Sequence, residues 1–181
     1  MRYAALFRGL NVGGRHRVEM AALRAMLSAL GLEQVSTYIQ SGNALFSTHR
    51  EEPFLRLEIA KAFRDTFGFE SPVILRNSEE MEALVKGVPF SPRELAQARE
   101  AAAGAESLYC YLLEAPLAAG QAGVIPQRDA EDRLVIAGRE IYLLCHQSIR
   151  SSKLAASLEK LSVPMTCRNL KTLEKLLELL Q

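Results

Sequence analysis

Apolar and polar positions follow two periods along the chain, and these periods predict an ordered series of strands and helices. In the first half, short apolar runs typical of strands alternate with stretches in which apolar residues recur every three or four positions. The stripe from Met20 to Leu30 is the first of these helical stretches, and Gly31 ends it. The expected strands are 3–8, 35–40, 44–47 and 72–75, and the expected helices are 20–30, 55–67 and 79–86.

The second half repeats this order. A short helical piece is expected after Pro116, and Gly138 marks the turn of a hairpin. Between the halves, Ser91 and Glu94 have the spacing of a capping box, which predicts the start of a helix. The expected strands are 108–113, 134–137, 140–145 and 164–167, and the expected helices are 154–161 and 170–180.

Two segments 92 positions apart also have identical residues at equivalent positions. Residues 71–85 read SPVILRNSEEMEALV, and residues 163–177 read VPMTCRNLKTLEKLL. Helical periodicity explains the shared apolar positions, but it does not explain the matching proline and the matching Arg-Asn pair. We therefore predict a duplication, in which Arg76-Asn77 and Arg168-Asn169 occupy equivalent points.

The order βαββαβ in each half predicts an α+β protein of two tandem ferredoxin-like (α/β-plait) subdomains, each with an extra helix and related by duplication. We expect residues 1–88 to form the first subdomain, 89–106 a connecting helix or linker, and 107–181 the second subdomain. Strands one and two run parallel in this topology. The loop after the first strand and the turn after the second should therefore share a rim of the sheet, about 10 Å apart at ~4.8 Å per strand.

The glycine-rich loop at residues 9–15, GLNVGGR, is the strongest candidate for a site. It fits the G-x-x-x-x-G frame of a phosphate loop, but Arg15 and His16 stand where lysine and a hydroxyl residue should follow, which disfavours nucleoside-triphosphate hydrolysis. The loop is still compatible with a general anion-binding site. Such a site would consist of exposed backbone amides, the N-terminus of the following helix, and the nearby Arg15 and Arg17. The alternative is a corner whose glycines only supply positive φ angles.

The candidate ligand-binding residues lie on this loop and on the turn expected at residues 41–43. The loop would hold the anion, and the turn would supply neutral hydrogen bonds. The candidates are Arg8, Gly9, Asn11, Gly13, Gly14, Arg15, Gln40, Ser41 and Asn43.

Three motifs resemble the DUF1697 family of bacterial proteins. They read FRGLNVGG from Phe7, TYIQSGNALF from Thr37 and TCRNLKTLEKL from Thr166, and together they span nearly the whole chain. The third departs from the family pattern, because Leu170 stands where an aromatic residue usually follows the Arg-Asn pair. The resemblance implies two α/β-plait subdomains and supplies no activity. The matching positions are Arg8, Gly9, Asn11, Gly13, Gly14, Tyr38, Gln40, Ser41, Gly42, Asn43, Arg168, Asn169 and Thr172.

The motif of Arg168, Asn169 and Thr172 is expected to be structural rather than ligand-binding. Its twin, Arg76-Asn77, falls at a strand-to-helix junction, away from the expected rim. Asn169 is placed to cap the final helix, and Arg168 can bind carbonyl groups at the end of the strand.

Other patterns point to no catalytic centre, cofactor or metal. Cys145 and His146 are neighbours on an expected strand, so they point to opposite faces and cannot act as nucleophile and base. Cys145 is expected to be a small core residue. The three histidines show no metal-ligand spacing.

Composition narrows the class of protein. Three widely spaced cysteines disfavour both a disulfide framework and a zinc site, and they favour a reducing cytoplasm. No apolar run approaches the ~20 residues of a membrane span. Net charge is only +1, which disfavours nucleic acid as a partner without excluding it. Tyr3 and Phe7 share one strand face, as do Tyr109 and Tyr111, and these side chains are expected to pack under helices or between the two subdomains rather than stack on bases. We expect a monomer.

These patterns together favour a cytoplasmic protein that binds an anionic small molecule or nucleotide, a phosphate-bearing ligand, at the loop of the first subdomain. One alternative is an enzyme acting on a phosphorylated substrate, with Arg8 or Arg15 stabilising charge and Ser41 or Asn43 orienting it. Another is a structural or protein-interaction module without a small-molecule ligand, in which the loop motifs serve only folding.

Overall fold

The computed structural model describes residues 1–14 and 16–181. The described chain divides into two compact units, each made of more than one segment. The first comprises Met1–Ala83, Pro164–Thr166 and Glu174–Gln181, and the second comprises Leu84–Val163 and Cys167–Leu173. The boundaries expected from sequence, 1–88, 89–106 and 107–181, stay a prediction.

The first unit contains a four-stranded antiparallel sheet with the order β2-β3-β1-β4. The central strand β1 places Ala5 opposite Ala44 of β3 on one side and opposite Leu75 of β4 on the other. β2 and β3 form a hairpin in which Tyr38 faces Asn43. The elements from the N-terminus onward are β1 (Arg2–Phe7), α1 (Met20–Ala29), β2 (Glu33–Tyr38), β3 (Asn43–Ser47), α2 (Glu52–Phe67), β4 (Val73–Asn77) and α3 (Ser78–Lys86).

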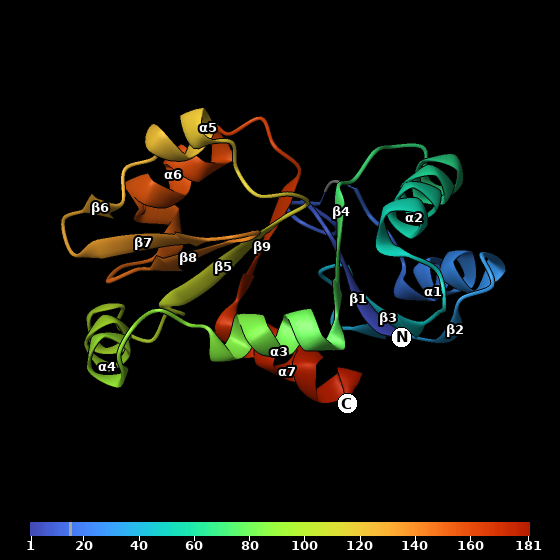
Figure 1. Cartoon of the computed structure of the whole chain (residues 1–181), viewed down its shortest axis with the longest axis horizontal. Coiled ribbons are helices and arrows are strands. Elements are labelled where there is room, and N and C mark those ends of the chain that lie inside the picture. Colours follow the sequence, from blue (N-terminus) through green and yellow to red (C-terminus); the bar gives the residue numbers. More distant parts are fainter. Residues whose placement is uncertain (15) are drawn as a thin grey trace. The chain divides into compact units, whose positions relative to one another are not determined.

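One face of this sheet packs against α1 and α2, which lie beside each other on it (Figure 1). Side chains alternate along a strand, so Tyr3, Ala5 and Phe7 of β1 share this face, and all three are buried. Phe63 of α2 stacks on Phe7, with the ring centroids 5.1 Å apart. The expectation that Tyr3 and Phe7 are core residues is confirmed.

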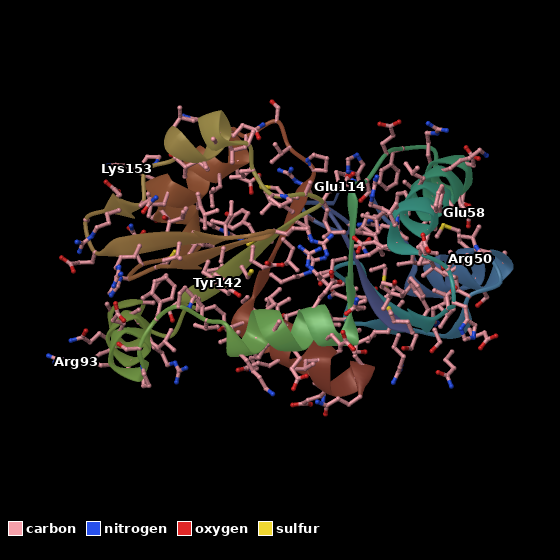
Figure 2. All side chains as sticks on the ribbon, in the orientation of Figure 1. Arg50, Glu58, Arg93, Glu114, Tyr142 and Lys153 are labelled. Carbon is pink, nitrogen blue, oxygen red and sulfur yellow. The ribbon has the colours of Figure 1, made fainter. Side chains whose placement is uncertain are left out.

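Arg50, between β3 and α2, ties the two helices of this face together. Its guanidinium donates to the carbonyl of Leu30, just after α1, and pairs with Glu58 of α2, both at 2.5 Å (Figure 2). The Arg50 and Glu58 side chains are partly exposed, so the ion pair contributes at most about 1 kcal/mol. α2 then ends at Gly68, which adopts the left-handed conformation.

The second unit contains a five-stranded sheet with the order β6-β7-β8-β5-β9. β8 pairs antiparallel with both β5 and β7, and the β7–β8 hairpin turns through Gly138. The sequence did not predict β6 or η1, because two or three residues are too short to show a period. The remaining elements are α4 (Pro92–Ala101), β5 (Leu108–Leu113), α5 (Ala119–Gly123), β6 (Arg128–Asp129), β7 (Asp132–Ala137), β8 (Glu140–Leu144), η1 (Ile149–Ser151), α6 (Lys153–Glu159), β9 (Met165–Asn169) and α7 (Leu170–Leu180).

Helices lie on both sides of the second sheet, with α6 on one side and α4 on the other (Figure 1). α6 buries Leu154 and Leu158. The predicted capping box of α4 is confirmed, since Ser91 Oγ accepts from the Glu94 N–H and Glu94 accepts from the Ser91 N–H. Hydrogen bonds from Ser91, together with the guanidinium of Arg133 on β7, hold the pKa of Glu94 below its ordinary value.

The fold is therefore mixed α+β, with two antiparallel sheets. In the first unit, β3 runs antiparallel to both β1 and β2, so the chain leaves β1 and β2 at the same end of the sheet. The glycine-rich loop and the hairpin turn follow these two strands. Within the described ranges, no helix is both long and apolar enough to cross a bilayer.

Candidate anion-binding site

The loop between β1 and α1 is held closed by the side chain of Asn11. Its amide donates to the carbonyls of Val18 (3.0 Å) and Gln40 (2.7 Å), and its Oδ1 accepts from the N–H of Val18 (2.9 Å). The backbone N–H of Asn11 donates to the carbonyl of His16 at 3.2 Å. Both amide hydrogens of Asn11 are thus engaged within the protein. We infer that this side chain shapes the loop rather than binding a ligand.

Gly13 and Gly14 present bare backbone at the surface of the loop. Their φ angles, 61° and 75°, lie in the left-handed region, and no atom stands within 4 Å of the place a Cβ would take. Glycine is therefore required here by backbone conformation and not by packing. Exposed N–H groups in successive turns of this kind are accessible to an anion.

The turn between β2 and β3 begins two residues earlier than the sequence suggested. It was expected at 41–43, but β2 ends at Tyr38 and β3 begins at Asn43, so the turn comprises residues 39–42. The reason is Ile39, whose φ of 49° is incompatible with an extended strand and ends the ladder.

Asn43 closes this turn from inside. Its side chain is fully buried and donates to the carbonyl of Tyr38 at 3.2 Å and to Ser41 Oγ at 3.0 Å. A ligand could reach a fully buried amide only by displacing its neighbours. We therefore assign Asn43 a structural role in the turn.

The loop and the turn are in direct contact. The Phe7 N–H donates to the Gly42 carbonyl at 2.8 Å, beside the bond between Asn11 and Gln40. A Cβ added to Gly42 would stand 2.9 Å from Leu10 Cδ1 and 3.1 Å from Phe7 Cβ. Only glycine allows this approach. The predicted shared rim is confirmed, but the expected spacing of about 10 Å is wrong, because the loop and the turn touch each other.

A hollow of about 440 Å³ opens where the loop, the turn and the start of α1 meet. Three predicted candidates line it: Asn11, Gly14 and Gln40. Arg17, which the sequence placed near the loop, and Glu19, which it did not single out, also line it. The one signal for Glu19 was its position directly before the first apolar residue of a helix, and it proves to be the N-cap of α1.

Arg17 and Glu19 bring opposite charges to this hollow. Both side chains are exposed, and neither forms an ion pair with another described residue. α1 starts at Met20, and its first N–H groups carry the positive end of the helix dipole. The hollow is therefore lined by one basic residue, one acidic residue, two amide residues (Asn11 and Gln40), Gly14 and Val18, and it lies beside the start of α1.

Several predicted candidates do not line the hollow; these are Arg8, Gly9, Gly13, Ser41 and Asn43. At the end of β1, the Arg8 N–H donates to the Pro72 carbonyl at 3.0 Å, and the Arg8 carbonyl accepts from Ser71 Oγ at 2.9 Å. The backbone of Arg8 thus anchors the start of the loop beside β4. Arg15 lies outside the described residues.

Arg168 and Asn169 lie at the junction of β9 and α7. Asn169 Oδ1 accepts from the Thr172 N–H at 2.9 Å, which caps α7 as predicted, and Asn77 caps α3 in the same way at 2.9 Å. Arg168 Nη1 donates to the carbonyl of Cys167 at 2.8 Å. Burial lowers the pKa of Arg168 to about 10, so its guanidinium stays charged at neutral pH.

Replacing Asn169 by alanine is expected to lower the free energy of unfolding by about 1 kcal/mol, because the N–H of Thr172 loses its cap. Urea denaturation would measure the loss, and Asn77→Ala serves as the matched variant at the other junction. Ligand binding at the rim should survive both changes. Loss of binding with unchanged stability would show that Asn169 is a ligand residue.

The cysteines are poor nucleophiles. Cys145 is fully buried, as predicted, and burial with the nearby carboxylate of Asp132 raises its pKa to about 12. Burial also raises the pKa of Cys167 to about 12. Among the residues described, no group of three or more His, Cys, Asp or Glu side chains is placed to hold a metal ion.

The folded protein is expected to react only slowly with iodoacetamide at about pH 8, whereas all three thiols react quickly in denaturant. Cys110 and Cys145 are shielded by burial, and Cys167, which is partly exposed, by its raised pKa. Mass spectrometry after timed alkylation measures this. Rapid native labelling of Cys145 would contradict it.

A solved structure has a similar fold over the whole chain. The structure of the conserved bacterial protein SP0830 from Streptococcus pneumoniae matches with a TM-score of 0.77 and 28% identity, covering 99% of this chain and 98% of that one. None of the curated proteins matches. The family model described as a protein of unknown function (DUF1697) matches residues 1–142, which include both the loop and the turn. The chain therefore belongs to the DUF1697 family, as its motifs predicted.

Proposed function

We propose that the hollow beside the glycine-rich loop binds an anionic small molecule. The observation that carries this proposal is the exposed guanidinium of Arg17 in the same hollow as the bare backbone of Gly14. Arginine binds phosphate or carboxylate through two parallel hydrogen bonds, and glycine N–H groups and a helix N-terminus favour negative charge. The volume of about 440 Å³ is in the range of small-molecule pockets.

A hollow of similar size in the second unit is a weaker candidate for an anion. It measures about 420 Å³, and its charged lining consists of Glu100 and Glu131, with His146 beside them. Neither lysine nor arginine is among the described residues that line it. Two carboxylates would repel an anion, so we assign the ligand to the first unit.

Replacing Arg17 by alanine is expected to weaken binding of phosphate-bearing ligands by about 1.5–3 kcal/mol, the range for hydrogen bonds to charged groups. That loss corresponds to roughly 12- to 140-fold in affinity. Thermal-shift assays and calorimetric titrations at low ionic strength, with inorganic phosphate, ribose 5-phosphate and nucleoside monophosphates, measure it. Added salt should weaken wild-type binding, because the attraction is electrostatic.

The matched control is Arg93→Ala. Figure 2 shows Arg93 projecting outward from α4, and it lines neither hollow. Arg93→Ala should bind like the wild type. The anion-site proposal is wrong if no phosphate-bearing compound shifts the melting temperature of the wild type or gives a binding isotherm with it. It is also wrong if the two variants bind equally well. The loop would then serve only to connect β1 to α1.

We also propose that the two sheets arose by duplication of a ferredoxin-like βαββαβ unit. The first sheet has the strand order β2-β3-β1-β4, and the second has β7-β8-β5-β9 with β6 added at one edge. In both sheets, the first strand in the chain lies between the third and the fourth, and the second strand lies beyond the third. The caps formed by Asn77 and Asn169 give further support, since both stand at the junction of a last strand and the following helix.

We also propose that the protein is cytoplasmic and acts as a monomer. The three cysteines are all free, which supports a reducing, cytoplasmic environment. A nucleic-acid polymer stays disfavoured, because the net charge is only +1.

A further inference from the structure

A cap hydrogen bond does not explain Glu19, and what its carboxylate contributes to α1 is an interaction with the helix dipole. The N-cap position prefers Ser, Thr, Asp or Asn, whose short side chains accept from the first N–H groups of the helix. Glu19 stands at this position, with φ −71° and ψ 132°, and its side chain makes no cap hydrogen bond. Glu19 is exposed and is one of the residues that line the hollow, as is Arg17.

A site for a bare anion would be weakened by a carboxylate in its wall, because like charges repel. A ligand that suits this hollow must therefore offer hydrogen-bond donors to Glu19 as well as negative charge to Arg17. A vicinal diol is such a donor group, and carboxylates hold the ribose hydroxyls of nucleotides in this way in other folds. Phosphate and ribose lie close together in a nucleotide, as Arg17 and Glu19 do in the chain.

The rest of the hollow is compatible with a base. The side-chain amide of Gln40 carries both a donor and an acceptor, which matches the mixed edge of a nucleobase. Val18 adds an apolar contact, and the residues next to Asn11 and Gln40, Val12 and Ile39, are exposed apolar side chains. The φ of 49° at Ile39 is costly for a β-branched residue, and such strain is typical of functional segments.

We propose, on the basis of the anion site argued above, that the ligand is a ribonucleoside phosphate. Arg17 and the backbone amide of Gly14 hold its phosphate. Glu19 accepts hydrogen bonds from the ribose diol, and Gln40 faces the base. The inference thus rests on the proposed function and specifies the ligand class of the same hollow.

The test compares ribonucleoside 5′-monophosphates with their 2′,3′-dideoxy counterparts by calorimetric titration of the full chain. The wild type is expected to bind a ribonucleotide about tenfold or more tightly than its dideoxy counterpart, since tenfold corresponds to ~1.4 kcal/mol and a hydrogen bond to a charged group reaches this value. Equal affinity for the two ligands would overturn the inference. This comparison uses the wild type alone, so it does not depend on the folding of a variant.

Glu19→Gln should remove this discrimination, because the amide is a weaker acceptor and carries no charge. Glu51 provides the matched control: it is the N-cap of α2, is exposed, and likewise makes no side-chain cap bond. Glu51→Gln should discriminate like the wild type. Discrimination that persists in Glu19→Gln, checked to be folded by circular dichroism, would contradict the role of this carboxylate.

The failure of the inference and the failure of the proposed function give different results. If ribose 5-phosphate, ribonucleotides and dideoxynucleotides all bind equally well and depend on Arg17, the anion site stands and the nucleotide assignment is wrong. If none of them binds the wild type, the anion site itself is wrong, and the inference falls with it.

Discussion

Replacing Gly42 by alanine is expected to lower the free energy of unfolding by about 2–4 kcal/mol. The φ of 78° at this position costs a residue with a Cβ about 1–2 kcal/mol. The added carbon would also stand 2.9 Å from Leu10 Cδ1 and 3.1 Å from Phe7 Cβ. Leu10 and Phe7 are both buried in the core, so neither can give way without disturbing its packing.

Gly68→Ala separates the two causes. Gly68 has nearly the same φ, 77°, but nothing lies within 4 Å of the place its Cβ would take. The Gly68→Ala variant should therefore lose only about 1–2 kcal/mol of its free energy of unfolding, which is the cost of the backbone conformation. Urea denaturation followed by circular dichroism gives both values. Equal losses at Gly42 and Gly68 would mean that the contact between loop and turn is loose enough to accept a methyl group.

Replacing Asn11 by aspartate is expected to cost about 2–4 kcal/mol of stability, on the basis of two lost hydrogen bonds and the penalty for unpaired polar groups. Aspartate can still accept from the Val18 N–H, but it cannot donate to the carbonyls of Val18 and Gln40. A carboxylate oxygen would instead face these carbonyl oxygens, where the amide nitrogen now stands at 3.0 and 2.7 Å. We expect the loop to open and the hollow to lose its shape.

Asn11→Gly tests the same bonds without the added charge. The φ of 57° at Asn11 suits glycine, so this variant loses the three side-chain bonds and gains no backbone strain. Its loss should be smaller than that of aspartate, about 1–3 kcal/mol. Amide hydrogen exchange at Val18 should become faster, because its N–H no longer has the Oδ1 acceptor. If Asn11→Asp unfolds at the same urea concentration as the wild type, the side chain does not hold the loop.

Both Asn11 variants should also bind ligand more weakly, although Arg17 and Glu19 are unchanged in them. The hollow lies between the loop and α1, and the bonds from Asn11 to Val18 close that loop directly before α1. Unchanged affinity in a destabilised variant would indicate that the ligand binds elsewhere.

Hydrophobic periodicity alone placed most helices and strands. β5 at residues 108–113 and α7 at residues 170–180 have the bounds that the sequence predicted, because each is an uninterrupted run between turn or cap residues. The shared rim of the loop and the turn also followed from element order, although their direct contact did not. Two strands that pair antiparallel with a common neighbour must deliver their ends to the same edge of the sheet.

Only the tertiary structure decided which residues line the hollow. Asn11 and Asn43 resemble ligand residues in the sequence, yet carbonyl groups of the protein engage their amides. Glu19 belongs to no motif, and it lines the hollow because α1 begins beside the loop. Periods and propensities describe residues a few positions apart. These roles depend instead on bonds such as that between Asn11 and Gln40, 29 positions apart, whose partners the fold alone brings together.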